Sequence, residues 1–459
     1  MTPGFARTIY RLQEAALRRP TFSYLAELER SQWLPRAELE ALQTRKLNRL
    51  LQSALAHSSW HAQRLRTVGL AERVAAGEAT LADLARLPTM DKGDARRNAA
   101  DLVWHGVPGG AFRYNTGGSS GEPLIFHYGR ERQASDAAGR MRARRWWGVA
   151  AGEREAYLWG APVELAKTDR VKTLRDRLVN QLVLNAFAMS GARMDQYLAA
   201  LAAWQPRCLY GYASSVALLA AHAQARGIKP GLRRLRVVCT TGEPLYPHQR
   251  ELIGRVFGVP VANEFGSRDI GFTAHEAPGG GLLLMSESQV LEVLDASGAP
   301  ASAGASGEAV VTGLTSLAQP FIRYRTGDVV KLAEQADTGG RGLHVIAEVG
   351  GRQTDFVVRE DGALMHALAV IYVLRAVEGV VQFKCIQHAA QSMEVLVVPG
   401  AGWNEAARAA VVAGLTARLG AGVAVDVRVV AEIPAEASGK HRYVVSHVPL
   451  AAELKQAAA

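Results

Sequence analysis

The stretch Tyr114-Asn115-Thr116-Gly117-Gly118-Ser119-Ser120-Gly121-Glu122-Pro123 lies between two apolar runs and combines three glycines with Ser and Thr hydroxyls. Glycines let successive backbone N–H groups turn toward one anion, and the hydroxyls add further hydrogen-bond donors. This composition is typical of a loop that wraps a polyphosphate, so it favours a nucleotide-binding protein. Taken alone, the stretch is equally consistent with a Gly/Ser-rich surface turn.

Two familiar nucleotide-binding motifs are excluded at this stretch. A phosphate-loop NTPase needs Lys followed by Ser or Thr after the last glycine, whereas here Gly121 precedes Glu122-Pro123. No GxGxxG pattern lies in the segment either, so a dinucleotide-binding fold gains no support. The nucleotide interpretation therefore depends on the rest of the chain.

The composition is that of a large globular protein. With 459 residues, 48% hydrophobic and 21% charged, the chain exceeds what one hydrophobic core usually serves, so we expect a large domain and a smaller one. The sequence contains no run near the roughly 20 apolar residues of a membrane span, and its Arg-interrupted start lacks the apolar core of a signal peptide. We therefore expect a cytoplasmic protein without a membrane span.

The net charge of +10 favours anionic ligands such as nucleotides or coenzyme A. The basic residues are scattered, and clusters such as residues 140–145 are interpreted as a solvated face. No RNA- or DNA-binding motif accompanies them, so we expect no nucleic-acid partner. The cysteines Cys208, Cys239 and Cys385 form no CxxC pair, which predicts buried free thiols and no structural zinc site.

Hydrophobic periodicity predicts a chain that begins with helices and continues as an α/β domain. Between residues 36 and 66 the apolar residues follow the stripe of an amphipathic helix. From residue 156 to residue 263, short apolar runs alternate with helical stretches, and residues 279–312 change to closely spaced strands. The expected fold is a large α/β domain over residues 1–350 with a β-rich subdomain, followed by a small α+β domain over residues 351–459.

Further segments with suggestive chemistry lie where strands are expected to end in turns. Two of them are Val237-Val238-Cys239-Thr240-Thr241-Gly242-Glu243-Pro244-Leu245 and Asn263-Glu264-Phe265-Gly266-Ser267-Arg268-Asp269. The carboxyl ends of strands are where α/β proteins place ligands. The others are Arg323-Tyr324-Arg325-Thr326-Gly327-Asp328, Gly351-Arg352-Gln353-Thr354-Asp355 and Ser438-Gly439-Lys440-His441-Arg442. Taken singly, each is equally consistent with an ordinary turn, a helix cap or a surface lysine.

In this order, the segments resemble the motifs of the adenylate-forming superfamily, which contains acyl-CoA synthetases, adenylation domains and luciferases. The resemblance covers nearly the whole chain and is greatest to the phenylacetate-CoA ligase branch, with its relatives in capsular polysaccharide biosynthesis. It implies a ligase that uses ATP and Mg²⁺ to convert a carboxylic acid to an acyl-AMP. A thiol then takes the acyl group, and coenzyme A is the acceptor that the resemblance favours.

The resemblance also implies a role for each segment. The glycine-rich loop would hold the β- and γ-phosphates, the Gly-Glu-Pro turn would lie against adenine, and Asp328 would bind the ribose. Lys440, on the small mobile domain, would be the catalytic lysine, and Asp269 would be a catalytic residue and the Mg²⁺ ligand. The implied nucleotide-binding residues are Thr116, Gly117, Gly118, Ser119, Ser120, Gly121, Gly242, Glu243, Pro244, Phe265, Gly266, Ser267, Arg268, Asp328 and Arg352.

Two positions depart from the family pattern. Asp269 stands where the family has the longer Glu, and Arg268 stands where it has Thr, which puts the metal geometry in question. The cysteine cluster that binds zinc in some relatives is absent from the sequence, so we predict no structural metal. In the resemblance the acyl group would lie against Tyr210 and Tyr212, whose rings suit an aryl or medium apolar acid. Both tyrosines are equally consistent with core positions at a strand end.

Two alternative functions stay open. In the first, the protein adenylates an acid but transfers the acyl group to a carrier protein, or to a hydroxyl or amine in polysaccharide biosynthesis. Its partners would then include a carrier protein or polysaccharide-assembly enzymes. In the second, suggested by Arg268 and Asp269, the protein binds nucleotide but is catalytically silent. The sequence names neither the acid nor the oligomeric state, for which a homodimer is one alternative.

Overall fold

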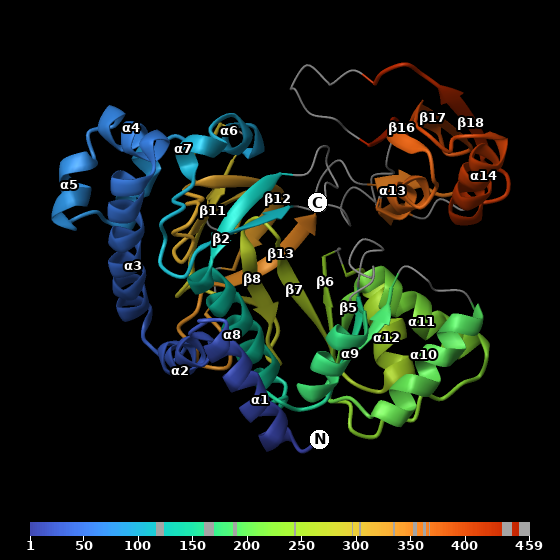
Figure 1. Ribbon diagram of the computed structural model, residues 1–459, viewed down its shortest axis with the longest axis horizontal. Helices are drawn as coiled ribbons and strands as arrows, with labels where there is room; N and C mark the ends of the chain where they lie inside the picture. Colours follow the sequence, from blue (N-terminus) through green and yellow to red (C-terminus); the bar gives the residue numbers. More distant parts are fainter. Residues whose placement is uncertain are drawn as a thin grey trace. The chain divides into compact units, whose positions relative to one another are not determined.

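The computed structural model describes residues 1–115, 124–159, 169–186, 191–242, 245–295, 297–302, 304–333, 336–351, 356–360, 364–366, 368–433 and 443–448. The chain divides into two compact units, which we call the large unit, Met1–Tyr114 with Ile125–Val349, and the small unit, Asn115–Leu124 with Gly350–Ala459. Figure 1 shows the helices and strands of both. None of the helices in the described ranges has the length and apolar character that crossing a bilayer requires.

The large unit begins with helices, as the periodicity predicts. α1 (Pro3–Ala16) starts where the Thr2 hydroxyl accepts a hydrogen bond from the backbone N–H of Phe5, and Pro3 suits its first turn. α3 (Arg36–His57) buries the predicted apolar stripe. The remaining elements of this group are α2 (Thr21–Ser31), α4 (Ser59–Thr67), α5 (Ala71–Ala76), η1 (Leu81–Arg86), α6 (Lys92–Arg97) and α7 (Ala99–Leu102).

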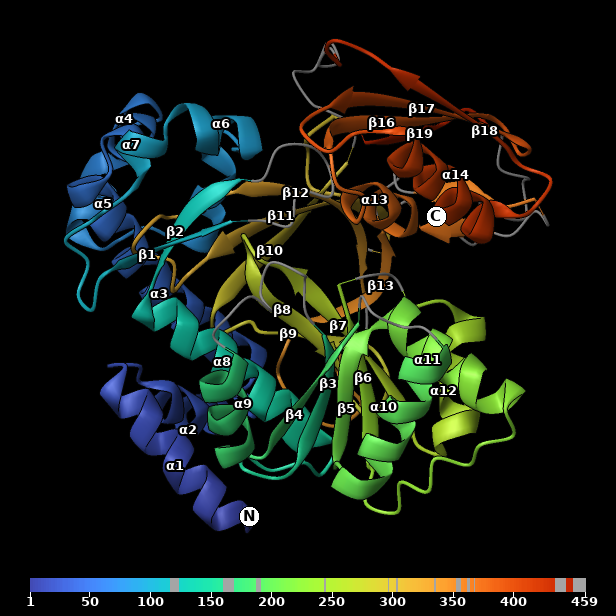
Figure 2. The same ribbon diagram turned by 45° about the vertical axis from the view of Figure 1, so that its right-hand side comes forward.

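A long mixed sheet runs through the large unit, and Figure 2 shows its strands edge to edge. Among the described residues it has 11 strands in the order β10-β11-β12-β13-β9-β8-β7-β6-β5-β3-β4. Strands β4, β3, β5, β6 and β7 are parallel, as the alternation of helices and strands predicts. Their bounds are β3 (Glu155–Trp159), β4 (Gln181–Asn185), β5 (Cys208–Tyr212), β6 (Val237–Thr241) and β7 (Val261–Ser267).

The β-rich part of the large unit continues this sheet with antiparallel strands. These are β8 (Gly271–Glu276), β9 (Leu282–Leu284), β10 (Gln289–Leu294), β11 (Ser306–Gly313), β12 (Tyr324–Leu332) and β13 (Val345–Gly351). A separate pair is formed by β1 (Ala111–Asn115) and β2 (Ile125–Gly129). The antiparallel strands thus extend the same sheet that contains the parallel strands.

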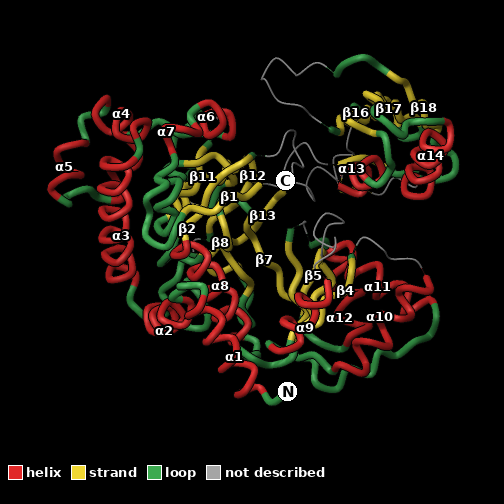
Figure 3. The backbone as a smooth tube through the Cα atoms, viewed as in Figure 1, coloured by secondary structure: helices red, strands yellow, loops and turns green. Residues whose placement is uncertain are grey.

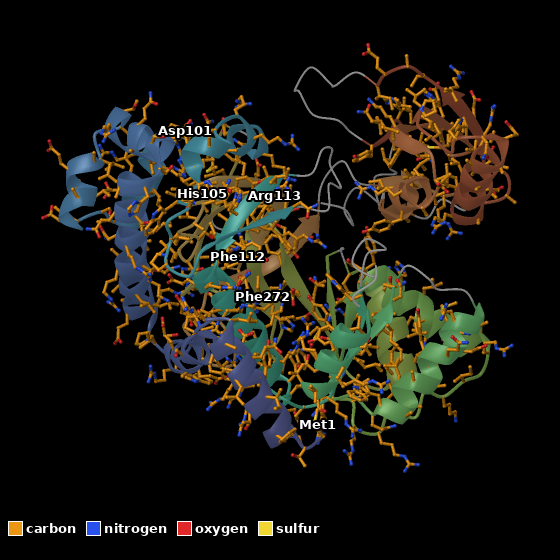
Figure 4. All side chains as sticks on the ribbon, viewed as in Figure 1. Met1, Asp101, His105, Phe112, Arg113 and Phe272 are labelled. Atoms are coloured by element: carbon orange, nitrogen blue, oxygen red, sulfur yellow. The ribbon has the colours of Figure 1, made fainter. Side chains whose placement is uncertain are left out.

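Helices cover both faces of the parallel strands. One face packs on an apolar core with α10 (Gly191–Trp204), α11 (Ala213–Ala225) and α12 (Pro247–Phe257). The other face meets α8 (Arg130–Trp146), whose Arg144 guanidinium lies 5.1 Å from the ring centre of Tyr210. Arg140 of the same helix lies 5.2 Å from the ring of Phe272, which is labelled in Figure 4. Because neighbouring residues in a strand point to opposite faces, Leu209 joins the first core and Tyr210 faces α8.

The small unit has its own sheet and core, shown in Figure 3 by strands in yellow and helices in red. In the described part of this unit a sheet of four strands has the order β18-β17-β16-β19, and α13 and α14 supply apolar residues to the same core. The bounds are β14 (Phe356–Val358), β15 (Leu364–His366), α13 (Leu368–Arg375), β16 (Val380–Ala389), β17 (Ser392–Pro399), α14 (Glu405–Leu419), β18 (Ala424–Val429) and β19 (Val444–Ser446).

Two interpretations of the composition meet different outcomes. The three cysteines are free and buried, which confirms that prediction. The solvated face assigned to residues 140–145 is wrong for Arg142 and Arg144, which are 0% and 8% exposed, whereas Arg145 is exposed as predicted. Arg142 and Arg144 pair with Glu287 and Glu155 respectively. The charges are buried because α8 lies between the sheet and α2, where Arg142 also donates to the backbone oxygen of Leu28.

Candidate functional site

The candidate site lies at the carboxyl ends of β5, β6 and β7. Hydrogen bonding in register places Tyr212 beside Thr241, and Thr241 beside Glu264. Each strand then leaves the sheet. Gly242 directly follows the last residue of β6, and Gly266 lies next to the last residue of β7. Because ligands of open α/β sheets bind outside the carboxyl ends of the strands, this edge is where the predicted nucleotide residues are expected to act.

Asp269 occupies the turn between β7 and β8, and its carboxylate is held from two sides. The phenolic hydroxyl of Tyr324 donates to Oδ2 at 2.8 Å, and the Ser267 hydroxyl donates to Oδ1. The side chain is 4% exposed. The turn is narrow because a Cβ at Gly266 would collide with the backbone oxygen of Gly271. The structure thus brings together two of the predicted segments, the one that contains Asp269 and the one that contains Tyr324.

Arg268 precedes this carboxylate and points to a different neighbour. Its guanidinium lies 5.5 Å from the ring centre of Tyr114, at the start of the glycine-rich stretch. Its backbone oxygen accepts a hydrogen bond of 2.7 Å from the guanidinium of Arg132 on α8. Arg132 also pairs with Asp136, which in turn accepts from the backbone N–H of Phe272. The first turns of α8 therefore fix the backbone on both sides of Asp269.

Gly242 has φ +76°, a left-handed conformation in which L side chains are strained. A Cβ there would lie 3.2 Å from the ring of Tyr212, so the glycine lets the turn pass over that ring. Tyr212 stacks on Trp159 of β3 with ring centres 4.3 Å apart. The strand ends thus carry an aromatic wall beside the turn that follows β6.

Tyr210 precedes Tyr212 by two residues in β5, so it lies on the same face of the sheet, and it is 6% exposed. Its hydroxyl donates to Oε1 of Glu264 at 2.9 Å, and the Thr241 hydroxyl donates to the same oxygen at 3.1 Å. The Nε of Arg140 lies 3.5 Å from that oxygen as well. Burial and the adjacent Glu264 carboxylate raise the pKa of Tyr210, so its hydroxyl stays protonated and donates. Tyr210 and Tyr212 therefore share a face, but Tyr212 belongs to the aromatic wall and Tyr210 to a buried polar cluster.

Asp328 lies in β12, the strand that begins with Tyr324. It is half-buried, and its backbone N–H donates to the Thr326 hydroxyl at 3.0 Å. The preceding Gly327 is exposed with φ +77°. Phe265, by contrast, is buried within the core between β7 and the antiparallel strands. The ribose role expected of Asp328 and the nucleotide role expected of Phe265 stay predictions.

The residues of this site can supply one protein ligand to a Mg²⁺ ion. Nucleotide sites hold Mg²⁺ through one or two carboxylates, and phosphates and water supply the other oxygens. Asp269 offers one buried carboxylate whose orientation Ser267 and Tyr324 fix. Within the described ranges no group of three or more His, Cys, Asp or Glu side chains forms a cage of its own. Asp269 therefore fits a metal shared with a nucleotide.

Several predicted site residues lie outside the described part of the chain. These are Thr116, Gly117, Gly118, Ser119, Ser120, Gly121, Glu243, Pro244, Arg352 and Lys440. Their roles stay predictions.

The sequence interpretation missed residues that organise the site. Glu264, Tyr324 and Arg132 were assigned no role, and Arg140 was placed on the solvated face of residues 140–145. A signal was available, because Arg132, Asp136, Arg140 and Arg144 recur every four residues along a predicted helix. Such spacing puts them on one helix face. Four charges on a face that packs against a sheet indicate a buried network.

Comparison with known proteins finds sequence relatives across most of the chain. Residues 357–447 match the family described as the CapK C-terminal domain. Protein CapK of Staphylococcus aureus is 22% identical over 379 residues, which cover 80% of this chain and 81% of that protein. A phenylacetate-coenzyme A ligase of Thermus thermophilus is 25% identical over 379 residues, which cover 78% of this chain and 79% of that ligase.

Solved structures of 2-hydroxyisobutyryl-CoA ligase share the fold. One, in complex with 2-HIB-AMP and CoA, matches with a TM-score of 0.63 and 19% identity over 93% of this chain and 94% of that one. A second, in the postadenylation state, matches with a TM-score of 0.61 and 20% identity over 94% of this chain and 93% of that one. The predicted resemblance is therefore confirmed: this chain has the fold of the adenylate-forming ligases and is similar in sequence to CapK and to a phenylacetate-coenzyme A ligase.

Proposed function

We propose that this protein is an AMP-forming ligase that activates a carboxylic acid with ATP and transfers the acyl group to the thiol of coenzyme A. The observation that carries the proposal is the contact between Tyr324 and Asp269, which joins two of the nucleotide segments at the carboxyl edge of the sheet. The shared fold and the similarity to a phenylacetate-coenzyme A ligase support the same reaction. An aryl or medium apolar acid suits this edge, since Tyr212 and Trp159 present aromatic faces there.

The chemistry explains why such a site needs fixed charges. A carboxylate is a poor acyl donor because its oxygen leaves badly. Its oxygen attacks the α-phosphorus of ATP, a P–O bond to the β-phosphate breaks, and acyl-AMP and pyrophosphate result. Charge grows on the phosphate oxygens, so preorganised donors and cations stabilise the transition state, and removing one commonly lowers the rate by about 10²- to 10³-fold.

Several of the predicted residues have a definite place in this reaction. The backbone and hydroxyls of Thr116–Gly121 bind the leaving phosphates, and Lys440 places its ammonium at the α-phosphate and the attacking carboxylate. Gly242, Glu243 and Pro244 lie against adenine, and Asp328 accepts hydrogen bonds from the ribose. Asp269 would hold Mg²⁺, which neutralises phosphate charge when it is bound. In this proposal residues 351–459 form a mobile domain that presents Lys440 for adenylation.

A second acceptor deserves a test because of the similarity to CapK. In that version the acyl group passes from acyl-AMP to a carrier-protein thiol, or to a hydroxyl or amine of a polysaccharide precursor. The first step and its residues are unchanged.

Pyrophosphate release separates these versions. The purified protein is given ATP, Mg²⁺ and a panel of aryl, fatty and amino acids, with and without coenzyme A. We expect one class of acid to give steady release that consumes coenzyme A stoichiometrically. Acid-dependent formation of acyl-AMP without coenzyme A consumption would support the alternative acceptor. Nucleotide binding without release for any acid would contradict adenylation altogether.

A further inference from the structure

Glu264 is a buried carboxylate at the edge of the sheet where β5, β6 and β7 end. Its side chain is 4% exposed, and it lies between Thr241 of β6 and His275 of β8 in the sheet. An ionised group in such a position needs hydrogen-bond partners, because the loss of hydration otherwise disfavours its charge. The arrangement of those partners is uneven between the two carboxylate oxygens.

In the described part of the chain, the partners of Glu264 all contact Oε1. The Tyr210 hydroxyl lies at 2.9 Å, the Thr241 hydroxyl at 3.1 Å and the Arg140 Nε at 3.5 Å. Within the described ranges, no hydrogen bond reaches Oε2. A carboxylate has roughly four lone-pair sites over its two oxygens, so Oε2 retains acceptor capacity.

Two other buried glutamates of this chain differ. Glu287 accepts from Ser31 and Arg142 at Oε1 and from Arg142 again at Oε2. Glu14 is 1% exposed and accepts from Arg19 at Oε1 and from Thr21 at Oε2. These two carboxylates serve the fold, and both of their oxygens are engaged. Glu155 is also contacted on one oxygen in the described ranges, by Tyr157 and Arg144 at Oε2, but it lies at the start of β3 and so at the opposite end of the strands. The one-sided contacts of Glu264, at the carboxyl edge of the sheet, therefore leave an acceptor there for a group that the protein itself does not supply.

The position of Glu264 decides which ligand group could reach it. In the strand register it is level with Thr241 and Tyr212, and it stands shortly before the Gly266 turn that leads to Asp269. Tyr212 and Trp159 form the aromatic wall at the same edge. A molecule held between that wall and the nucleotide segments would thus meet aromatic faces and, at one point, a carboxylate oxygen.

We propose that the acid activated by this protein carries a hydrogen-bond donor, a hydroxyl or an amino group, on its acyl part, and that Oε2 of Glu264 accepts from it. This inference rests on the proposed function and narrows its substrate to hydroxy- or amino-substituted acids. An unsubstituted acid would leave a buried acceptor unpaired, which a site built for a donor penalises strongly. Tyr210, Thr241 and Arg140 act as positioning residues that hold the carboxylate so that Oε2 stays available.

The test compares acids that differ by one group. Pyrophosphate release is measured for phenylacetic acid and its ring-hydroxylated and ring-aminated forms, and for butyric acid and its hydroxy and amino forms. For the wild-type protein we expect kcat/KM to be about 10- to 100-fold higher for at least one donor-bearing member than for its parent acid. The hydroxyl and amino arms tell which donor the site takes.

Glu264→Gln tests the residue itself. The hydroxyls of Tyr210 and Thr241 and the Arg140 guanidinium orient the amide so that its oxygen replaces Oε1 and its NH₂ replaces Oε2. An acceptor becomes a donor there, so the preference for the donor-bearing acid should fall to within about threefold while the parent acid is still used. Thr241→Val is the matched control, since it removes one partner of Oε1, leaves Tyr210 and Arg140 to hold the carboxylate, and keeps Oε2 as an acceptor, so most of the preference should remain. Thermal unfolding checks that both variants fold.

Two results would overturn the inference while leaving adenylation intact. One is equal kcat/KM for parent and substituted acids in the wild-type protein. The other is a loss in Glu264→Gln that is the same for every acid. The absence of pyrophosphate release with every acid in the panel would instead contradict the proposed function itself.

Discussion

The hydroxyl of Tyr324 donates a hydrogen bond to Oδ2 of Asp269 across 2.8 Å. The two residues lie in different segments, Tyr324 at the start of β12 and Asp269 in the turn after β7. Other strands separate β12 from β7 in the sheet. Two parts of the proposed nucleotide site are thus coupled by a direct contact, and this coupling can be measured.

Tyr324→Phe removes that hydrogen bond and keeps the ring. Hydrogen bonds to charged groups contribute about 1.5–3 kcal/mol, so kcat for acid-dependent pyrophosphate release should fall about 10-fold or more. The Mg²⁺ concentration for half-maximal rate should rise, because the Asp269 carboxylate loses a partner that orients it. Tyr197→Phe is the control, since it removes a bond of 2.9 Å to the backbone oxygen of Asn185 away from this turn. Equal kinetics in both variants would contradict a positioning role for Tyr324.

Asp269→Asn keeps the size of the side chain and removes its charge. If Asp269 is the protein ligand of Mg²⁺, pyrophosphate release should drop by about 10²- to 10³-fold. Titration of Mg²⁺ at fixed ATP measures the effect, and circular dichroism verifies the fold. A variant that retains a rate within threefold of the wild type would show that the metal is held elsewhere.

The ion pair of Arg142 and Glu287 should govern the stability of the large unit. Both side chains are 0% exposed, and Ser31 also donates to Glu287 at 2.8 Å. Arg142→Met leaves an uncompensated buried carboxylate, so the free energy of unfolding should fall by about 3–5 kcal/mol in urea denaturation. Arg145→Met is matched to it, because Arg145 is 50% exposed and pairs with Glu29 at the surface. That control should lose less than about 1 kcal/mol, and an equal loss in both would contradict the burial argument.

How much the sequence predicts differs between the sheet and the site. The parallel strands and their helices follow from alternating apolar runs, but α9 (Asp169–Leu178) and β4 were missed. α9 is rich in charged residues, and β4 is an edge strand that leaves Val183 39% exposed, so neither carries a clear apolar signal. The contact of Tyr324 with Asp269 could not be predicted either, because it joins residues that are 55 apart in the sequence and belong to strands that are not neighbours in the sheet. The Glu264 cluster depends on the register of three strands in the same way.

Acid should destabilise the large unit through His61. The ring is buried, and burial together with the adjacent Arg64 guanidinium lowers its pKa to about 3, while its Nε2 bonds to the backbone oxygen of Pro320. Below a pH of about 6.5 the unfolded chain binds a proton at this ring that the folded chain does not. The free energy of unfolding should therefore fall between pH 7 and pH 5 by about 2 kcal/mol from this group. Urea denaturation of wild type and His61→Gln measures it, because the difference between the two proteins should shrink by that amount at pH 5. A constant difference would contradict the assignment.

Lys440→Ala should separate the two half-reactions. The lysine is proposed to stabilise charge at the α-phosphate, so the variant should lose acyl-AMP formation by at least about 10²-fold. Transfer from synthetic acyl-AMP to coenzyme A should persist, because the lysine is proposed to be presented for adenylation and not for the attack of the thiol on the acyl carbon. Lys384→Ala, in the same domain, is the control and should leave both rates near wild type. Equal loss of both half-reactions would argue against a lysine dedicated to adenylation.

The central claim is that an acid and ATP react on this protein to give acyl-AMP and pyrophosphate. Exchange of labelled pyrophosphate into ATP measures that step without any acceptor. The account predicts exchange that requires both Mg²⁺ and a carboxylic acid and that Asp269→Asn abolishes. Tight binding of ATP with no exchange for any acid in the panel would contradict it.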